Sequence, residues 1–169
     1  MLSTTLAIVA CVAALILALR LIGPERVWRL WGPPDLGPVA FETLVRRKNP
    51  NDALAAPTGF SPARVDILPT DFPVPPRALA AAFTRALADE PRLEKVAEDA
   101  DGLSQRWVQR SALLRYPDTI AVRFLDRPGG HSTIALYGRS QIGRSDFGVN
   151  RARIVRWLDK LAREVPPVR

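Results

Sequence analysis

The chain begins with an apolar run that is too long and too uniform to belong to a soluble core. Residues 2–22 contain one charged side chain, Arg20, and three hydroxyl side chains, Ser3, Thr4 and Thr5. As a helix, these 21 residues would span about 30 Å, which is the thickness of the hydrocarbon core of a bilayer. We therefore predict that the run forms a single transmembrane helix.

A cleaved signal peptide is the alternative for the same run. Such a peptide begins with basic residues and ends at a cleavage site of the small-x-small type. Here no Lys or Arg precedes the apolar residues, and the run ends in LALRLIG. These features favour an anchor that stays attached to the mature protein.

The segment that follows, GPERVWRLWGPP, has the composition of a membrane interface. Trp28 and Trp31 suit the headgroup layer of a bilayer. Arg20, Arg26 and Arg29 suit the phosphates of the lipids. We predict a short interfacial helix here. The alternative is a plain linker whose tryptophans pack on the domain.

Residues 32–62 are rich in Pro, Gly and Asn and show no clear periodicity. Such a composition is typical of an extended tether. Three apolar side chains within it, Phe41, Leu44 and Phe60, require burial. We therefore expect the tether to wrap around the domain rather than to float free.

The rest of the chain combines two helical patterns with short runs typical of strands. Short turns make consecutive strands antiparallel, and each helix has one apolar face that must cover the sheet. We predict an α+β domain: an antiparallel sheet of about five strands with two helices on one face, in the order β-α-β-β-β-β-α, preceded by one transmembrane helix. The predicted strands are residues 63–69, 93–102, 104–114, 119–126 and 132–140, and the predicted helices are residues 75–91 and a last helix with the stripe Ile154, Leu158, Leu161 and Val165. The chain then divides into a transmembrane anchor (1–23), an interfacial segment and Pro/Gly-rich tether (24–62) and the α+β domain (63–169).

Positive charge is concentrated in the last part of the chain. Residues 102–169 hold 13 Lys and Arg against 5 Asp and Glu. Positive potential near a bilayer attracts anionic headgroups, so a lipid bilayer is the expected partner, with a membrane protein complex as a further one. Nucleic acid is not an expected partner, because the aromatic residues of this region stand in apolar contexts typical of a core.

The stretch GRSQIGRSDFGVNRAR, residues 138–153, differs at one position from a phosphate-binding loop. That motif, G-x-x-x-x-G-K-[ST], leads directly into a helix within a parallel sheet. Here Asp146 and Gly148 interrupt the path to the helix, and the residues after Ser145 suffice for one helix and no further strand. Nucleotide hydrolysis is therefore not predicted.

A structural lock is the first hypothesis for this stretch. Arginines in the first turn of the last helix meet the positive end of the helix dipole, so a negative group is expected nearby. In the lock, the carboxylate of Asp146 or Asp118 is bound by Arg139, Arg144 or Arg151.

An external anion is the second hypothesis. Arg144, Arg151 and Arg153, with Ser145 and exposed backbone amides, would then hold a phosphate or carboxylate. Either Asp146 or Asn150 is expected to cap the helix. The candidate residues of this anion-binding or structural motif are Arg139, Ser140, Arg144, Ser145, Asp146, Asn150, Arg151 and Arg153.

Other chemistry-bearing residues form no recognisable site. Cys11 is the only cysteine, which leaves the domain without a disulfide or a Cys-based metal site, and the only histidine, His131, lies in a predicted hairpin turn. The acidic residues between 89 and 101 are interleaved with Arg92 and Lys95, as on a solvated face. We expect no catalytic residues, no metal and no cofactor.

The basic stretch, together with QRSALLRYPDTIAV upstream, resembles the bacterial and plastid family of domain of unknown function 1499. The family signature is a strand ending in R-S-x-S/R-x-G, followed by S-D-L/F-G-V-N-R-x-R-I. The resemblance covers roughly residues 49–164 and implies a shared fold without an established activity. Many relatives carry two cysteines around a Pro-Asn pair, whereas this chain keeps Pro50 and Asn51 and lacks both cysteines. The matching positions are Arg110, Ser111, Pro117, Asp118, Arg139, Ser140, Gly143, Ser145, Asp146, Gly148, Val149, Asn150, Arg151 and Arg153.

Together these features predict a single-pass protein of the bacterial inner (plasma) membrane, whose domain is a non-catalytic binding or assembly module at the bilayer surface. The alternative function is binding of an anionic small molecule or lipid headgroup near Arg144 and Arg151. The side of the membrane stays open. Positive residues after the span favour a cytoplasmic domain, whereas relatives with lipoprotein features or paired cysteines imply export.

Overall fold

The structure, a computed structural model, describes residues 2–168, and within its first helix the side chains of residues 4–14 and 17. Its α-helices and strands are α1 (Leu2–Ile22), α2 (Pro24–Trp28), β1 (Asp52–Ala55), α3 (Pro76–Ala86), β2 (Leu93–Glu98), β3 (Ser104–Arg110), β4 (Pro117–Arg127), β5 (His131–Ser140) and α4 (Val149–Glu164). Short 3-10 turns lie at Arg29–Trp31 (η1), Phe41–Thr43 (η2) and Pro128–Gly130 (η3).

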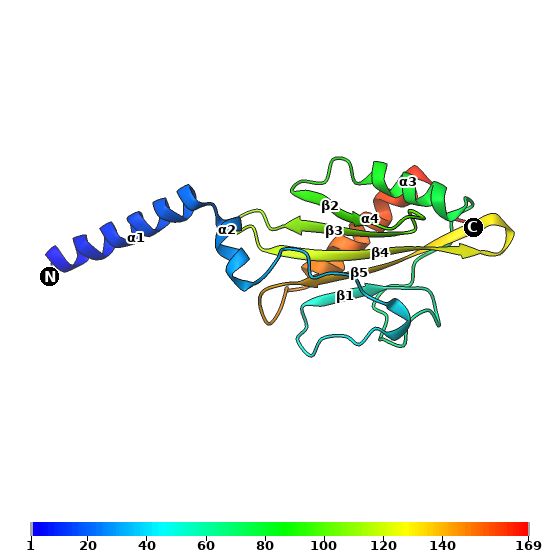
Figure 1. The fold of residues 1–169 in the computed structure, drawn as a ribbon, viewed down its shortest axis with the longest axis horizontal. Helices are drawn as coiled ribbons and strands as arrows, with labels where there is room; N and C mark the ends of the chain where they lie inside the picture. The colour runs from blue at the N-terminus through cyan, green and yellow to red at the C-terminus, as the bar shows by residue number, and fades with distance from the viewer. Residues whose placement is uncertain (1, 169) are drawn as a thin grey trace.

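One antiparallel sheet of five strands forms the centre of the domain, in the order β1-β5-β4-β3-β2 (Figure 1). The long hairpin of β4 and β5 lies in its middle, and the short strand β1 closes the edge beside β5. The observed order of elements in the domain is β-α-β-β-β-β-α. The predicted α+β class with an antiparallel sheet is therefore confirmed.

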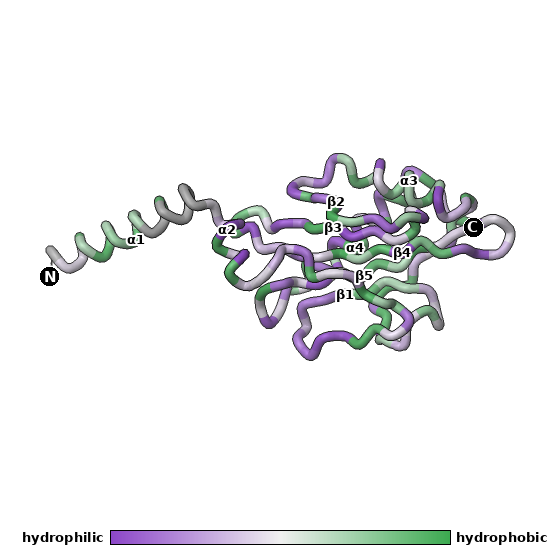
Figure 2. The backbone as a smooth tube through the Cα atoms, viewed as in Figure 1, coloured by the Kyte–Doolittle hydropathy of each residue, from purple (hydrophilic) through white to green (hydrophobic). Residues whose placement is uncertain are grey.

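Helices α3 and α4 pack on one face of the sheet and enclose the main core. Phe83 of α3 lies at its centre and makes edge contacts with the rings of Phe124 and Trp157. In Figure 2 each of β4 and β5 has an apolar stretch near its middle, and the residues Ile120–Val122 and Ile134–Leu136 of these stretches are buried, as expected for strands covered on both faces.

The opposite face of the sheet is covered by part of residues 32–62, which we predicted to be an extended tether. Phe41 and Leu44 are buried there against Leu54 and Tyr137, so the expected wrapping is confirmed. The backbone N–H of Leu36 also donates to Oγ1 of Thr119 at 2.9 Å. The segment is thus a layer of the domain and leaves no free linker.

The first strand lies upstream of its predicted place. Residues 63–69 were predicted as a strand, which is wrong: they are irregular and make a single bridge, between Ile67 and Ala55. The reason is a turn held by Asp66, whose carboxylate accepts hydrogen bonds from the Leu54 backbone N–H at 3.0 Å and from Arg46 at 2.7 Å. Strand β1 pairs with β5 instead.

Helix α1 projects away from the domain (Figure 1). Among the residues that the structure describes, no helix combines the length and the apolar character of a membrane span. The side chain of Arg20, which we predicted at the interface, lies outside the described set.

Candidate functional site

The predicted motif forms a corner between the end of β5 and the start of α4. Gly138 of β5 lies directly beneath the first turn of the helix, where a Cβ atom would come within 2.6 Å of Oδ1 of Asn150. Real Cβ atoms do not approach an oxygen so closely. The glycine therefore allows α4 to begin in contact with the sheet.

Asn150 is fully buried in the first turn of α4 and joins three segments. Its Nδ2 donates to Oγ of Ser140 at 3.0 Å and to the carbonyl of Asn51 at 3.3 Å. Nδ2 of Asn51 in turn donates to the carbonyl of Gly143 at 2.8 Å. These bonds hold β5, the corner loop and the chain before β1 together.

Arg153 is the charged centre of the corner. Its guanidinium donates to Oδ2 of Asp118 and to Oε1 of Gln109, each at 2.6 Å, and to Oδ1 of Asn150. The side chains of Arg153 and Asp118 are only 5% and 12% exposed. This buried, charge-assisted cluster is a structural lock between α4 and strands β3 and β4.

The three arginines named in the lock hypothesis lie elsewhere, so that assignment was wrong. Arg139 reaches the opposite face of the sheet and donates to the carbonyls of Leu36 and Gly37. Arg144 and Arg151 are exposed and form no hydrogen bond or ion pair with another described residue. The reason is periodicity: β5 alternates its side chains, and the helical repeat turns Arg153, not Arg151, toward the core.

The N-cap of α4 is Gly148, so neither of the two predicted capping residues, Asp146 and Asn150, holds that position. Asp146 lies two residues before the N-cap and binds the start of the helix from there. Its carboxylate accepts hydrogen bonds from the backbone N–H groups of Gly148 at 3.0 Å and Asn150 at 2.8 Å. A negative group at this position also balances the positive end of the helix dipole. The neighbouring Ser145 accepts a hydrogen bond from the Phe147 backbone N–H through its Oγ at 3.2 Å.

The polar network continues to Glu90, a buried carboxylate that the sequence did not reveal. Nε2 of Gln109 donates to Oε2 of Glu90 at 3.1 Å, and Arg156 and Lys160 form ion pairs with it at 3.0 and 2.9 Å. Burial by itself raises the pKa of Glu90. The hydrogen bonds from Arg156, Lys160 and Gln109 outweigh it and lower this pKa from 4.5 to about 2.

Because the pKa of Glu90 is lowered in the folded state, the free energy of unfolding of the domain depends on pH in the acidic range. Because the folded-state value lies below the unfolded one, the contribution is fully present above about pH 4.5 and is lost as the pH falls toward about 2. This contribution to the free energy of unfolding amounts to about 2 kcal/mol, a value that is reduced for solvent screening because Arg156 is partly exposed. Urea unfolding at pH 7 should show Glu90→Gln less stable than wild type by about that amount, and the difference should vanish near pH 2. An equal difference at both pH values would contradict this origin.

The predicted interface residues outside α1 lie in α2 and η1. The ring of Trp28 packs on Tyr116 at 4.5 Å between centroids, and its Nε1 donates to the carbonyl of Leu114. Trp31 is exposed, as are Arg26 and Arg29. One tryptophan thus packs on the domain, as the linker alternative predicted, while the other faces solvent.

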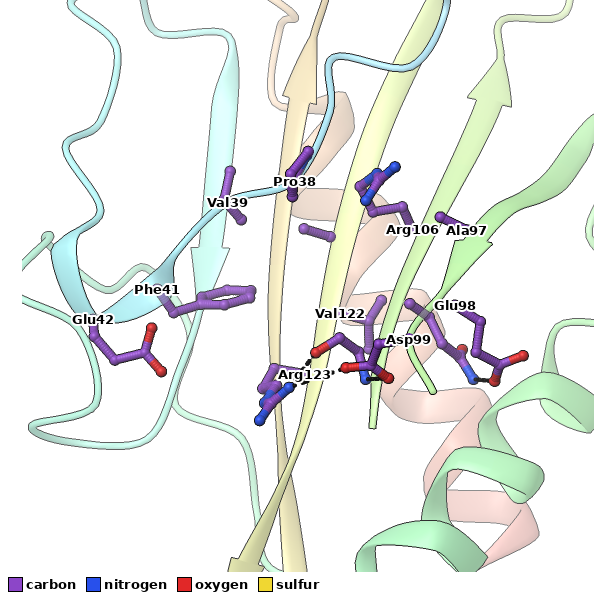
Figure 3. Close-up of a pocket in the computed structure, with 13 residues that line it drawn as sticks. Pro38, Val39, Phe41, Glu42, Ala97, Glu98, Asp99, Arg106, Val122 and Arg123 are labelled. Carbon is purple, nitrogen blue, oxygen red and sulfur yellow. Dashed lines mark hydrogen bonds and ion pairs between the residues drawn. The ribbon is translucent and has the colours of Figure 1, made fainter. Parts of the chain in front are cut away.

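Several hollows open on the domain, and two of them bear on a candidate binding site. The first, about 390 Å³, lies on the sheet face opposite the helices, between residues 38–42 and strands β2 to β4 (Figure 3). Its arginines, Arg106 and Arg123, pair with Asp35 and Asp99 and so are not free for a ligand. The second, about 790 Å³, lies beside the corner and is lined by residues 44–50, Pro62, Ala63, Arg64 and Asp66 together with Asp52, Ala53, Ser145, Asp146, Gly148 and Arg151.

The hydrogen bonds and ion pairs of the corner stabilise the fold. Arg153 bonds to Gln109, Asp118 and Asn150, whereas Oδ1 of Asn51 is buried without a hydrogen-bond partner among the described residues. The only histidine of the sequence lies at the other end of β5. Among the described residues, no group of three His, Cys, Asp or Glu side chains could hold a metal ion. Sequence reasoning missed Gln109 and Glu90, because nothing in their local spacing indicates that Gln109 meets Arg153 or that Glu90 meets Gln109. Asn51 could have been identified from the sequence by one feature, its place in the Pro-Asn pair of the family.

Comparisons with known proteins cover the corner and the sheet. The model of a family described as protein of unknown function (DUF1499) matches residues 45–161. No curated protein matches the chain. Among solved structures, the chain is similar to the crystal structure of TTHA0849 from Thermus thermophilus, with 15% identity and a TM-score of 0.34, over 67% of this chain and 95% of that one.

Proposed function

This chain belongs to the DUF1499 family, and from that premise we propose that it is a membrane-anchored, non-catalytic binding or assembly module that acts at the bilayer surface. The matched region contains the whole corner, from Asn51 to Arg153, and with it the lock. In this proposal the lock keeps the module rigid, and residues 2–22 hold it at the membrane.

The observation that carries the proposal is the state of α1. Its described large apolar side chains, among them Leu6, Ile8, Val9 and Leu17, are exposed. A helix that is apolar all round is normally buried in protein or in lipid. The domain does not cover these described side chains, which are apolar in Figure 2. A bilayer would remove these side chains from water.

Two arginines in the middle of α1 should release the chain from membranes. We expect the double variant Ala10→Arg and Ala13→Arg to move from the membrane pellet to the soluble fraction, because a charge at the centre of a span strongly opposes insertion. The measurement is the fraction of full-length chain that sediments with membranes after an alkaline carbonate wash.

The matched control is Ala78→Arg with Ala81→Arg, two exposed alanines at the same spacing on α3. This variant should sediment as the wild type does. A wild type that the wash removes would refute anchoring through a span. A double α1 variant that stays in the pellet would show that another part of the chain holds it.

The anion-binding alternative has weaker support. Arg151 is exposed and lines the 790 Å³ hollow. The carboxylates of Asp52, Asp66 and Asp146 line the same hollow, and Arg144 is not among its lining residues. Of the other basic residues that line it, Arg46 and Arg64 pair with Asp52 and Asp66, and Arg47 donates to the carbonyl of Ser140. Lys48 and Arg151 are then left to bind an anion beside Asp146, so we propose this function second.

A further inference from the structure

The proposed anchor ends one residue before a segment that is fastened to the domain. α1 ends at Ile22, and α2 begins at Pro24. Trp28 of α2 is held by the ring of Tyr116 and by the carbonyl of Leu114. Even a fully extended chain from residue 22 to residue 28 spans only about 20 Å.

A second contact fastens the chain just after η1. Nε2 of Gln141, in the loop between β5 and α4, donates to the carbonyl of Pro33 at 2.6 Å. Beyond this point the chain runs across the sheet as a layer of the domain. If α1 lies in a bilayer, the end of the domain that carries these contacts must therefore lie at the bilayer surface.

Three segments share that end of the domain: α2 with η1, the β3–β4 loop and the β5–α4 loop (Figure 1). We call them the docking end, comprising residues 24–32, 111–116 and 141–148. The β4–β5 turn lies at the opposite end (Figure 1). The corner motif thus contributes its loop to the side from which α1 projects.

Large apolar side chains of the docking end are exposed instead of packed. Leu30 is 81% exposed, Trp31 62%, Leu113 85% and Phe147 95%. Phe147 also has a φ of +52°, a left-handed conformation that is unfavourable for a bulky residue. Its side chain contributes almost nothing to the core at this exposure, so folding alone gives no reason for a phenylalanine there.

The charges of the docking end complement an anionic surface. Its acidic side chains are already engaged: Glu25 pairs with Arg110 at 3.6 Å, and Asp146 accepts backbone N–H groups. Four arginines make no ion pair with any described residue, namely Arg26, Arg29, Arg115 and Arg144. Positive side chains beside exposed aromatic and aliphatic ones are typical of segments that bind anionic bilayers.

We propose that the docking end is a second membrane attachment, which seats the domain directly on a bilayer that contains anionic lipids. Leu30, Trp31, Leu113 and Phe147 insert among the headgroups, and the four arginines bind lipid phosphates. The proposal rests on the membrane anchor proposed above, and it names the surface that faces the lipid. It gives Phe147 and Arg144 a role that the lock does not.

The test uses the full chain with Cys11→Ser and one new cysteine, either Phe147→Cys or Leu68→Cys, labelled with the same environment-sensitive dye. Leu68 is a matched control, since it is 67% exposed and lies beside Arg127 at the start of the β4–β5 turn. The chain is reconstituted into vesicles of phosphatidylcholine with a minor fraction of phosphatidylglycerol. Lipids spin-labelled near the headgroup should quench the dye at 147 and not at 68, and iodide should do the reverse.

The arginines supply a second readout. Each arginine is expected to raise the ratio of domains whose docking end is bound to the bilayer to those whose docking end is free by about fivefold. The triple variant Arg29→Gln, Arg115→Gln and Arg144→Gln should therefore lose most lipid quenching at 147 while remaining carbonate-resistant. Vesicles of phosphatidylcholine alone should have the same effect on the wild type.

The outcomes separate this inference from the proposed function. A chain that does not enter vesicles refutes the anchor. A carbonate-resistant chain whose dye at 147 is quenched by iodide and not by lipid refutes the docking end and leaves the anchor standing. A purely structural role for Phe147 requires that Phe147→Asn lower the melting temperature. If Phe147 serves only in docking, the melting temperature of Phe147→Asn should be unchanged or higher, because asparagine tolerates the left-handed conformation.

Discussion

Replacing Arg153 with methionine should lower the free energy of unfolding by about 3–5 kcal/mol. The substitution keeps an unbranched side chain but leaves the carboxylate of Asp118 buried without its ion-pair partner. It also removes the hydrogen-bond donor from Oε1 of Gln109 and from Oδ1 of Asn150. An unpaired buried charge costs far more than the loss of a surface pair. Urea unfolding in mild detergent, followed by tryptophan fluorescence, measures the change.

The matched control is Arg151→Met, on the same helix two residues earlier. Arg151 is exposed and has no partner among the described residues, so its replacement should change stability by no more than about 0.5 kcal/mol. Adding Asp118→Asn to Arg153→Met should restore part of the loss, since the stranded charge is removed. Equal effects of the two arginine variants would show that the lock does not stabilise the domain.

The second large effect is expected from Gly138→Ala, which should cost about 2–4 kcal/mol. The new methyl group would lie 2.6 Å from Oδ1 of Asn150, so the first turn of α4 must move away from β5. That movement disturbs the bonds from Asn150 to Ser140 and Asn51. Thermal unfolding of the two proteins gives the difference.

A second glycine separates crowding from backbone strain. Gly130 has a φ of +76°, and a Cβ atom there would meet nothing within 4 Å. Gly130→Ala should therefore cost only about 1 kcal/mol, from the left-handed conformation alone. In the Gly138→Ala background, Asn150→Ala should cost less than it does in wild type, because the clash is gone. If the two alanine variants are equally stable, close packing at Gly138 is not the cause.

Local patterns were sufficient for the fold class. The β4–β5 hairpin, the apolar stripe of α3 and the stripe of α4 are each visible in the sequence, because each repeats at the period of its own element. Strand β1 was not visible. Its four residues, DALA, are too few and too poor in β-branched side chains to stand out, and their pairing with β5 supplies the preference that the sequence lacks.

The candidate site also has some features that could be predicted from the sequence and others that could not. Motif spacing singled out Asp146, whose carboxylate binds backbone N–H groups at the start of α4, because such contacts are local, although the N-cap itself is Gly148. The partners of the arginines were not predictable. Arg153 meets Asp118 across 35 positions and Gln109 across 44 positions, and that choice depends on how α4 lies on the sheet.

The sequence by itself therefore determined the two helices of the domain, the strands other than β1, the apolar run at the N-terminus and the motif of the corner, because propensity and periodicity act over a few neighbouring positions. Only the tertiary structure decided which arginine is buried, which face the segment after η1 covers, and which exposed loops share an end with α1. Those are long-range outcomes, set by which surfaces pack together once the sheet has formed. The surface proposed to meet the lipid belongs to this second group.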